Sequence, residues 1–244
     1  MCRHIGYIGP PVRLSTLLLD PPHGLLHQSW APRDMRGGGT INADGFGVGW
    51  YADIGPVRYR RASPLWSDAG FAELARATEA AAVLAAARSA TVGMPVTESA
   101  CAPFAADGWL FSHNGVVAGW PDSVAKLAER LPVVDLLTLD AATDSALLWA
   151  LLRHRLRTGA GPVAALRGLA ADVGAAAPGS RLNILLTNGR EVYATAAGHA
   201  LSTWHTPGRV LIASEPFDDD PGWTPVPDRH LVIADGSTCI VEEL

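Results

Sequence analysis

The second residue of the chain is a cysteine, in the start Met1-Cys2-Arg3-His4. If Met1 is removed, Cys2 carries both a thiol and a free α-amine. The thiolate is the attacking form of cysteine, and an α-amine with a pKa of about 7.7–8.0 can accept the thiol proton near neutral pH. The start therefore predicts an N-terminal cysteine nucleophile that is activated by its own amine. The alternative is a chance cysteine on a first strand.

Three later positions carry groups that such a nucleophile could use. Asn114-Gly115 joins a side-chain amide donor to a glycine N–H, the two kinds of donor found in oxyanion holes. Arg88 follows an apolar stretch, and its planar guanidinium can hold a carboxylate through two parallel hydrogen bonds. Asp144 opens a predicted helix, where the helix dipole favours a carboxylate. Each also has a purely structural interpretation. Asn114-Gly115 could be a hairpin turn, Arg88 could be part of an ion pair, and Asp144 could be an acidic residue at a helix start.

Two further features give weaker signals. His113 precedes the asparagine and invites a Cys-His dyad, but the terminal amine makes a histidine base unnecessary. The segment Asn42–Trp50 has glycines at alternating positions, which indicates the close approach of another backbone or a ligand. It lacks the glycine order of a dinucleotide site, so we expect no nicotinamide cofactor.

Taken in order along the chain, these elements resemble the class II glutamine amidotransferases of the N-terminal nucleophile hydrolase superfamily. The resemblance covers nearly the whole chain. It implies that Cys2 attacks a γ-glutamyl amide, and that Asn114 with the N–H of Gly115 forms the oxyanion hole. It also implies a four-layer αββα sandwich.

The same resemblance assigns the glutamyl-binding residues. It implies that Arg88, helped by Thr91, binds the α-carboxylate, and that Asp144 receives the α-ammonium. We place His113 in the same substrate-binding set. No metal ligand spacing appears, and no cofactor is implied.

Within this family, further segments are similar to the γ-glutamyl amidohydrolases of ergothioneine biosynthesis. They are Asp20–Leu25, Asn42–Gly47, Arg88–Gly93 and Ser214–Trp223. That similarity implies hydrolysis of γ-glutamyl-hercynylcysteine sulfoxide. Amidotransferases usually carry a fused synthase domain, and none follows the catalytic unit here, which favours a free-standing hydrolase. The alternatives are a glutaminase subunit that supplies ammonia to a separate synthase and a non-catalytic γ-glutamyl-binding module.

A hercynyl substrate contains a trimethylammonium group, which acidic or aromatic surroundings can hold. The candidate residues are Trp30, Trp50, Trp223 and Asp218–Asp220. We expect the Ser214–Trp223 loop to border the acceptor side of the catalytic pocket. The alternative is that the tryptophans belong to the core and the aspartates to a solvated turn.

The expected elements agree with two sheets covered by helices. Period-two patterns predict strands at both ends of the chain, and helical spacing predicts helices between them. The α+β class follows from this segregation, with mostly antiparallel sheets and one domain over residues 1–244. The predicted helices include Val12–Leu19, Phe71–Ala80, Ser123–Leu131, Thr143–Arg157 with Thr143 as N-cap, and Pro162–Val173.

Composition excludes several other classes of protein. The net charge of −5 and the scattered arginines argue against a nucleic-acid surface. The three cysteines are an odd number without CxxC spacing, which predicts neither disulfides nor structural zinc. No secretory signal or membrane-length apolar run is visible, so we expect a soluble cytoplasmic protein with a small-molecule substrate. The oligomeric state is left open.

Overall fold

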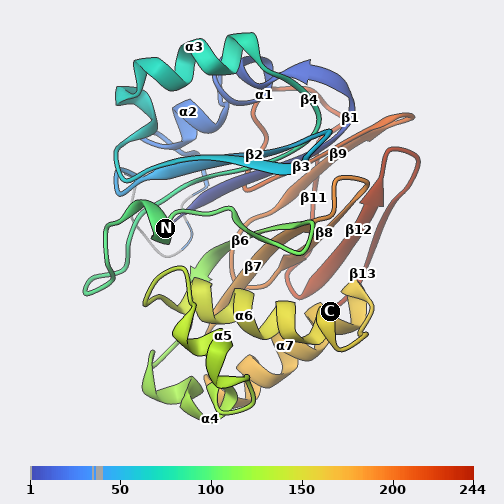
Figure 1. The fold of residues 1–244 in the computed structure, drawn as a ribbon. Helices are drawn as coiled ribbons and strands as arrows, with labels where there is room; N and C mark the ends of the chain where they lie inside the picture. The colour runs from blue at the N-terminus through green and yellow to red at the C-terminus, as the bar shows by residue number, and fades with distance from the viewer. Residues whose placement is uncertain (1, 35, 37–40) are drawn as a thin grey trace.

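The computed structural model describes residues 2–34, 36 and 41–244, so Met1, whose removal the sequence predicts, lies outside the described residues. Two β-sheets face each other between two layers of helices (Figure 1). The strand pairs within each sheet are antiparallel. This is the αββα sandwich that the sequence predicts.

One sheet has seven strands and contains the start of the chain. In order, they are β11 (Thr224–Pro225), β9 (Ser202–Thr206), β10 (Arg209–Ala213), β1 (Arg3–Arg13), β4 (Glu79–Ala87), β2 (Phe46–Ala52) and β3 (Gly55–Arg61). Arg3 lies opposite Ala87 in the register of β1 and β4. The residue before β1 therefore lies beside the residue after β4.

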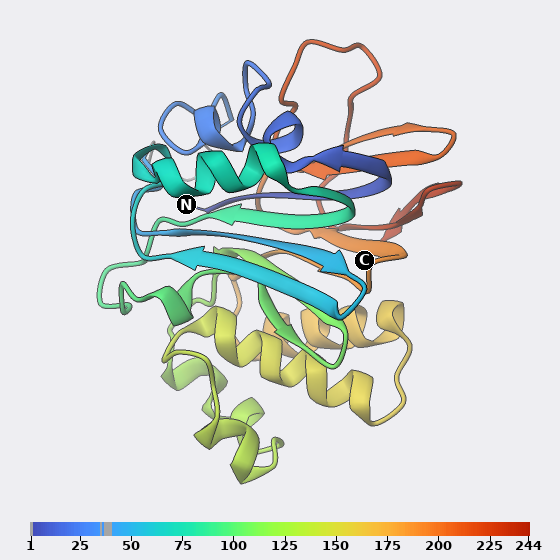
Figure 2. The same cartoon turned by 45° about the horizontal axis from the view of Figure 1, so that its top comes forward.

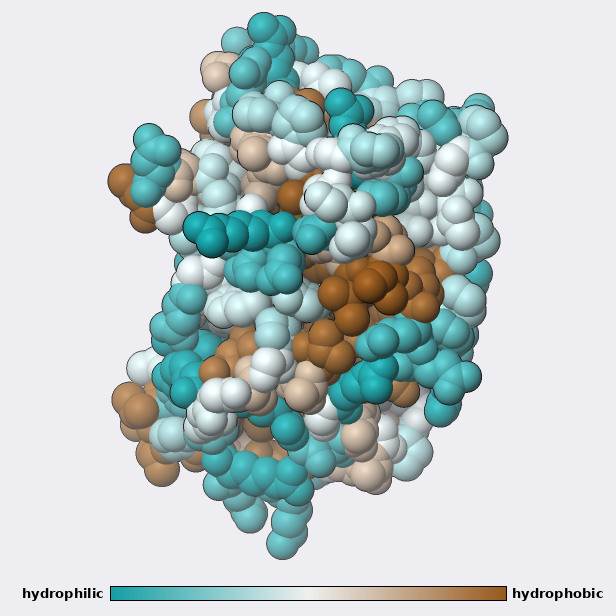
Figure 3. Space-filling view, turned by 90° about the vertical axis from the view of Figure 1, so that its right-hand side faces the viewer, coloured by the Kyte–Doolittle hydropathy of each residue, from teal (hydrophilic) through white to brown (hydrophobic). Residues whose placement is uncertain are grey.

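The second sheet has six strands. In order, they are β13 (Cys239–Glu243), β12 (His230–Asp235), β8 (Glu191–Ala196), β7 (Arg181–Thr187), β6 (Trp109–Val116) and β5 (Phe104–Ala106). Asn114 near the end of β6 lies opposite Asn183 of β7. β13 is an edge strand, with Ile240 51% and Val241 41% exposed. The molecular face on the right of Figure 1 carries a patch of apolar side chains among polar ones (Figure 3).

Helices cover the outer face of each sheet (Figures 1 and 2). Those over the seven-stranded sheet are α1 (Leu14–Leu18), α2 (Leu25–Gln28) and α3 (Ala69–Ala77), and those over the six-stranded sheet are α4 (Ala125–Ala128), α5 (Val133–Leu137), α6 (Asp144–Arg157) and α7 (Pro162–Ala176). Three 3-10 turns are also present, at Leu65–Ser67, Glu98–Ala100 and Asp122–Val124. The Thr143 hydroxyl accepts a hydrogen bond from Ala146 N at 3.2 Å, which confirms the predicted N-cap of α6.

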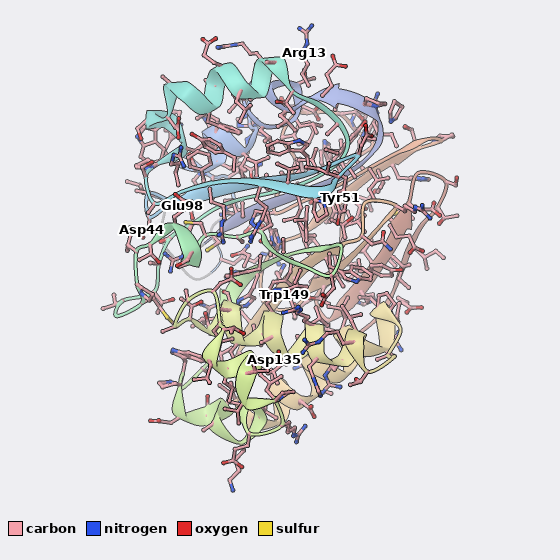
Figure 4. The ribbon with its side chains drawn as sticks, in the orientation of Figure 1. Arg13, Asp44, Tyr51, Glu98, Asp135 and Trp149 are labelled. Carbon is pink, nitrogen blue, oxygen red and sulfur yellow. The ribbon has the colours of Figure 1, made fainter. Side chains whose placement is uncertain are left out.

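Apolar side chains fill the space between the two sheets. Leu84, Leu110 and Leu185 belong to this layer, and burial of each such side chain contributes roughly 1.5–3 kcal/mol. Gly6 lies where β1 approaches the other sheet, since a Cβ there would be 3.3 Å from Val192 Cγ2. The Tyr51 hydroxyl donates to Thr187 O at 2.7 Å and so joins the two sheets (Figure 4).

Four of the predicted helices differ in their bounds from the observed ones. Phe71–Ala80 is helical only up to Ala77, because Glu79 and Ala80 already pair with β1 as part of β4, and Pro162–Val173 continues to Ala176.

The predicted helix Val12–Leu19 begins later, because Val12 still pairs with Ala80 as part of β1. The predicted helix Ser123–Leu131 is a 3-10 turn followed by the short α4, which ends at Ala128. The N–H groups of Arg130 and Leu131 bond to the carbonyls three residues before them, so the last turn has 3-10 rather than α-helical hydrogen bonding. No helix in the described part of the chain is long and apolar enough to cross a membrane.

Candidate active site

Cys2 lies immediately before β1, half-buried, in a small pocket that residues of both sheets line. Arg88, Phe104, His113 and Ser145 contribute to the walls, together with several alanines. The pocket holds about 20 Å³, which is room for roughly one water molecule. The structure thus brings together Cys2, Arg88 and His113, three of the residues singled out in the sequence.

The segment around Arg88 is held by backbone hydrogen bonds. Arg88 N donates to Gly45 O at 2.7 Å, and Asp44 N donates to Arg88 O at 3.0 Å. The Asp44 carboxylate accepts a further bond from Ala90 N at 2.7 Å. Asp44 and Glu98 lie near each other at the same edge of the molecule (Figure 4). The start of the alternating-glycine segment therefore fixes the backbone of the arginine.

The Arg88 side chain is 9% exposed, and its guanidinium has few protein partners. Its Nη1 donates to Pro95 O at 2.9 Å. The salt bridges among the described residues do not include Arg88, so its guanidinium can receive a carboxylate from a ligand. Thr91, predicted to help it, is exposed and does not line the pocket.

Asn114 and Gly115 lie at the end of β6, next to His113. Asn114 is fully buried, and its Nδ2 has a long hydrogen bond of 3.5 Å to Ser214 Oγ. A Cβ on residue 115 would lie 1.9 Å from Arg181 O, so only glycine fits at this position. The polar side chain of Asn114 is therefore held in a fully buried site beside a residue that must remain a glycine.

Asp144 and His113 form a second set of contacts at the start of α6. The two Asp144 carboxylate oxygens accept from Val117 N at 2.9 Å and Ser145 N at 2.7 Å. His113 Nε2 lies 2.9 Å from Arg181 O, and its Nδ1 lies 2.9 Å from Ser145 Oγ. A carbonyl oxygen only accepts, so Nε2 donates to Arg181 O, and Nδ1 shares a hydrogen bond with the serine hydroxyl. Both ring nitrogens are thus engaged, which argues against His113 as the base for Cys2.

Two more buried histidines lie near the nucleophile. The pKa of His4 falls from 6.5 to about 3, first because burial disfavours the charged form and then because nearby imidazole and guanidinium groups add repulsion. The pKa of His199 falls to about 4, again mainly through burial and then through Arg181. Arg181 Nε donates to His199 Nε2 at 3.0 Å. Both imidazoles are therefore neutral at pH 7.

Sequence reasoning missed the ionic contact beneath the nucleophile. Arg3 Nη1 lies 3.9 Å from Glu215 Oε2, and both side chains are almost fully buried. Glu215 also accepts backbone N–H groups of Arg33 at 2.9 Å and Asp34 at 2.7 Å. Arg3 and Glu215 both lie in motifs noted in the sequence, Met1–His4 and Ser214–Trp223. Neither motif indicates that its charged residue pairs with the charged residue of the other.

The remaining candidates lie elsewhere. Asp218 and Trp223 line a second pocket, which shares no lining residue with the pocket of Cys2. Trp30 is 49% exposed and contacts His27 with a ring separation of 4.5 Å. Trp50 packs on the helix-covered face of the seven-stranded sheet. The structure therefore does not bring these side chains to the nucleophile. Among the described residues, no group of three or more His, Cys, Asp or Glu could hold a metal ion.

Comparison with protein families identifies a match over most of the chain. Residues 25–207 match the model described as "Glutamine amidotransferases class-II". Among solved structures, a class II domain protein from Silicibacter pomeroyi is 22% identical, with a TM-score of 0.71 and 99% of each chain covered. The phosphoribosylpyrophosphate amidotransferase of B. subtilis is 14% identical, with a TM-score of 0.66 over 99% of this chain and 49% of that one. These neighbours share the αββα fold.

Similarity to curated proteins is closer. The chain is 46% identical to "Gamma-glutamyl-hercynylcysteine sulfoxide hydrolase" of Mycolicibacterium smegmatis over 95% of both chains. It is 45% identical to the protein of that name in Mycobacterium tuberculosis H37Rv, over 95% of this chain and 92% of the other. It is 32% identical to "Probable glutamine amidotransferase DUG3" of Saccharomyces cerevisiae, over 64% of this chain and 46% of the yeast protein.

Proposed function

The chain belongs to the class II glutamine amidotransferases, and from this premise we propose that it is a γ-glutamyl amidohydrolase with Cys2 as nucleophile. The observation that carries the proposal is the shared pocket of Cys2 and Arg88, a thiol beside a buried guanidinium with no carboxylate partner among the described residues. A γ-glutamyl compound offers an α-carboxylate for the arginine and a carbonyl for the thiol.

The proposed substrate is γ-glutamyl-hercynylcysteine sulfoxide, which is cleaved to glutamate and hercynylcysteine sulfoxide in ergothioneine biosynthesis. The names of the mycobacterial relatives, which align over nearly their whole length, support this choice. The proposal includes removal of Met1, a single catalytic domain and a cytoplasmic location, where a reducing environment keeps the thiol of Cys2 reduced.

The reaction begins when the α-amine of Cys2 takes the thiol proton and Sγ attacks the γ-carbonyl carbon. The carbonyl oxygen becomes an oxyanion, and Asn114 Nδ2 with the Gly115 N–H donates to it. The α-ammonium of Cys2 then returns its proton to the leaving amine as the carbon–nitrogen bond breaks. Water hydrolyses the remaining glutamyl thioester, which releases glutamate and restores the thiol.

The glutamyl group is held at its two charged ends. Arg88 binds the α-carboxylate, and this contact replaces the bond from Nη1 to Pro95 O. Asp144 binds the α-ammonium with the acceptor capacity that its two backbone contacts leave. A pocket of about 20 Å³ is too small for this group, so the proposal requires the pocket to widen when the substrate binds.

The test follows the nucleophile and the substrate together. Purified protein is incubated with γ-glutamyl-hercynylcysteine sulfoxide, glutamate release is measured, and intact mass reports Met1 removal and the thioester. We expect turnover that Cys2→Ala abolishes and Cys239→Ala retains. If glutamine is hydrolysed faster than the sulfoxide, the alternative role as a glutaminase subunit replaces this one. Binding without turnover, with Met1 retained, would identify a non-catalytic module.

A further inference from the structure

A larger pocket lies on the helix-covered face of the seven-stranded sheet. It holds about 420 Å³, within the range of about 300–1,000 Å³ that is typical of small-molecule sites. Tyr7 and Leu211 of the sheet, Leu17 of α1 and Trp223 of the 214–223 loop line it. It shares no lining residue with the Cys2 pocket, so the proposed reaction leaves it without a role.

Four aromatic residues contribute to its wall. Phe217 and Trp223 meet edge to face, with ring centroids 5.0 Å apart, and Tyr7 and Trp204 complete the set. The Tyr7 hydroxyl donates to Pro10 O at 2.6 Å, so its hydrogen is already used. A Cβ on Gly222 would lie 2.8 Å from Trp204 Nε1, so the glycine allows the loop to close against that ring. The rings are therefore held in place around the cavity.

The rim of the pocket is acidic. Asp20, Asp218 and Asp220 line it, and Arg209 is the only cationic residue among the lining residues. Within the described part of the chain, none of the three aspartates forms a salt bridge, whereas the neighbouring Asp219 pairs with Arg33 at 3.1 Å.

The acidic rim is fixed to the aromatic wall. Trp223 Nε1 donates to Asp218 Oδ1 at 2.7 Å, which orients both the ring and the carboxylate. The guanidinium carbon of Arg209 lies 5.9 Å from the centre of the Trp204 ring, near the outer limit of a cation–π contact. The Arg209 guanidinium therefore makes only a weak contact with the Trp204 ring and leaves the other aromatic rings of the pocket without a cation.

We propose that this pocket binds a small quaternary ammonium compound, independently of the catalytic centre. Aromatic faces and nearby carboxylates attract a positive charge. A fully methylated ammonium has no N–H, so it needs no hydrogen-bond acceptor and can lie against the rings. The net charge of the lining groups, three carboxylates against one guanidinium, has the sign that a cation needs. The proposal concerns a second site and does not depend on the identity of the substrate hydrolysed at Cys2.

The experiment compares choline with 3,3-dimethylbutan-1-ol, a neutral compound of the same shape, by saturation-transfer NMR and calorimetric titration. We expect choline to bind and the neutral compound to bind at least about tenfold more weakly. Trp223→Ala and Asp218→Asn should each weaken choline binding by about tenfold, while Arg209→Gln should strengthen it. The matched controls Trp66→Ala and Asp53→Asn, on exposed residues outside the pocket, should leave it unchanged.

A second arm separates the two pockets. Cys2 is first alkylated with 6-diazo-5-oxo-L-norleucine, a reactive glutamine analogue that occupies the glutamyl site. Undiminished choline binding to the alkylated protein supports a separate site. A failure to alkylate Cys2 counts against the proposed function alone, because the choline titration of the same sample still tests the second pocket. Loss of choline binding on alkylation, equal binding of the neutral compound, or insensitivity to Trp223→Ala overturns the proposal.

Discussion

The hydroxyl of Ser214 accepts a hydrogen bond from the backbone N–H of His4 at 3.0 Å, across 210 positions of the sequence. The same oxygen lies 3.5 Å from Asn114 Nδ2. One buried side chain therefore contacts both the strand that carries the nucleophile and the residue proposed for the oxyanion hole. We therefore expect Ser214 to position Asn114 for the proposed reaction.

Replacement of Ser214 tests this link. In Ser214→Ala the buried N–H of His4 loses its acceptor, which should lower the free energy of unfolding by about 1–3 kcal/mol. The freed Asn114 amide should lower kcat by about tenfold or more with little change in KM. Urea unfolding and steady-state kinetics measure the two effects, with the exposed Ser237→Ala as control. A stability loss with unchanged kcat would reduce Ser214 to a structural role.

The oxyanion role of Asn114 predicts a larger kinetic effect. Loss of one such donor costs about 10²–10³ in kcat, so Asn114→Ala should retain substrate binding and lose turnover on that scale. Circular dichroism checks the fold, since a fully buried side chain is removed. Asn188→Ala, in the turn between β7 and β8, should keep normal activity. Full activity of Asn114→Ala would contradict the assignment.

Arg88→Ala should act mainly on substrate binding. The glutamyl α-carboxylate carries the same charge in the ground state and the transition state, so loss of its partner should raise KM more than it lowers kcat. Arg88→Lys keeps the charge but not the paired hydrogen bonds, and should recover only part of the affinity. The control is Arg130→Ala, whose side chain is 59% exposed and pairs with Asp172. An unchanged KM in Arg88→Ala would remove Arg88 from the glutamyl site.

The fold class could be predicted because strand and helix periods are local properties of the sequence. Period-two runs after residue 180 and helical spacing in Thr143–Arg157 become strands and α6, and the N-cap Thr143 is correct. The bounds near Val12 could not be predicted, because the pairing of Val12 with Ala80 comes from a strand about seventy residues away. Tertiary pairing there overrides local helix preference.

The resemblance implies that Cys2 and Arg88 share one site, and the register of Arg3 with Ala87 gives the structural cause. His113 reaches the same pocket from β6 of the other sheet. The place of the 214–223 loop was not predictable in the same way. Its first residues lie beside β1, yet Asp218 and Trp223 reach a pocket on the other face of the sheet. Which face a loop covers depends on packing with α1, and a motif contains no information about that.

Buried neutral histidines predict a loss of stability in acid. His4 has a pKa of about 3 in the folded protein and 6.5 in the unfolded chain. Below pH 6.5 the unfolded chain binds a proton that the folded protein does not, so the free energy of unfolding falls as the pH is lowered towards 3. The limiting slope for one such histidine is about 1.4 kcal/mol per pH unit, and His199 adds to it.

Urea unfolding at a series of pH values from 8 to 5 measures this slope, an interval of roughly three units that crosses the ordinary histidine pKa of about 6.5. His199→Gln should make the dependence shallower, because one group that protonates only on unfolding has been removed. His4→Gln should do the same if it folds, and the His199 variant keeps the prediction testable if it does not. The matched control is His205→Gln, an exposed histidine on β9, which should keep the wild-type slope. An equal slope in wild type and His199→Gln would show that His199 is not the source of the acid sensitivity.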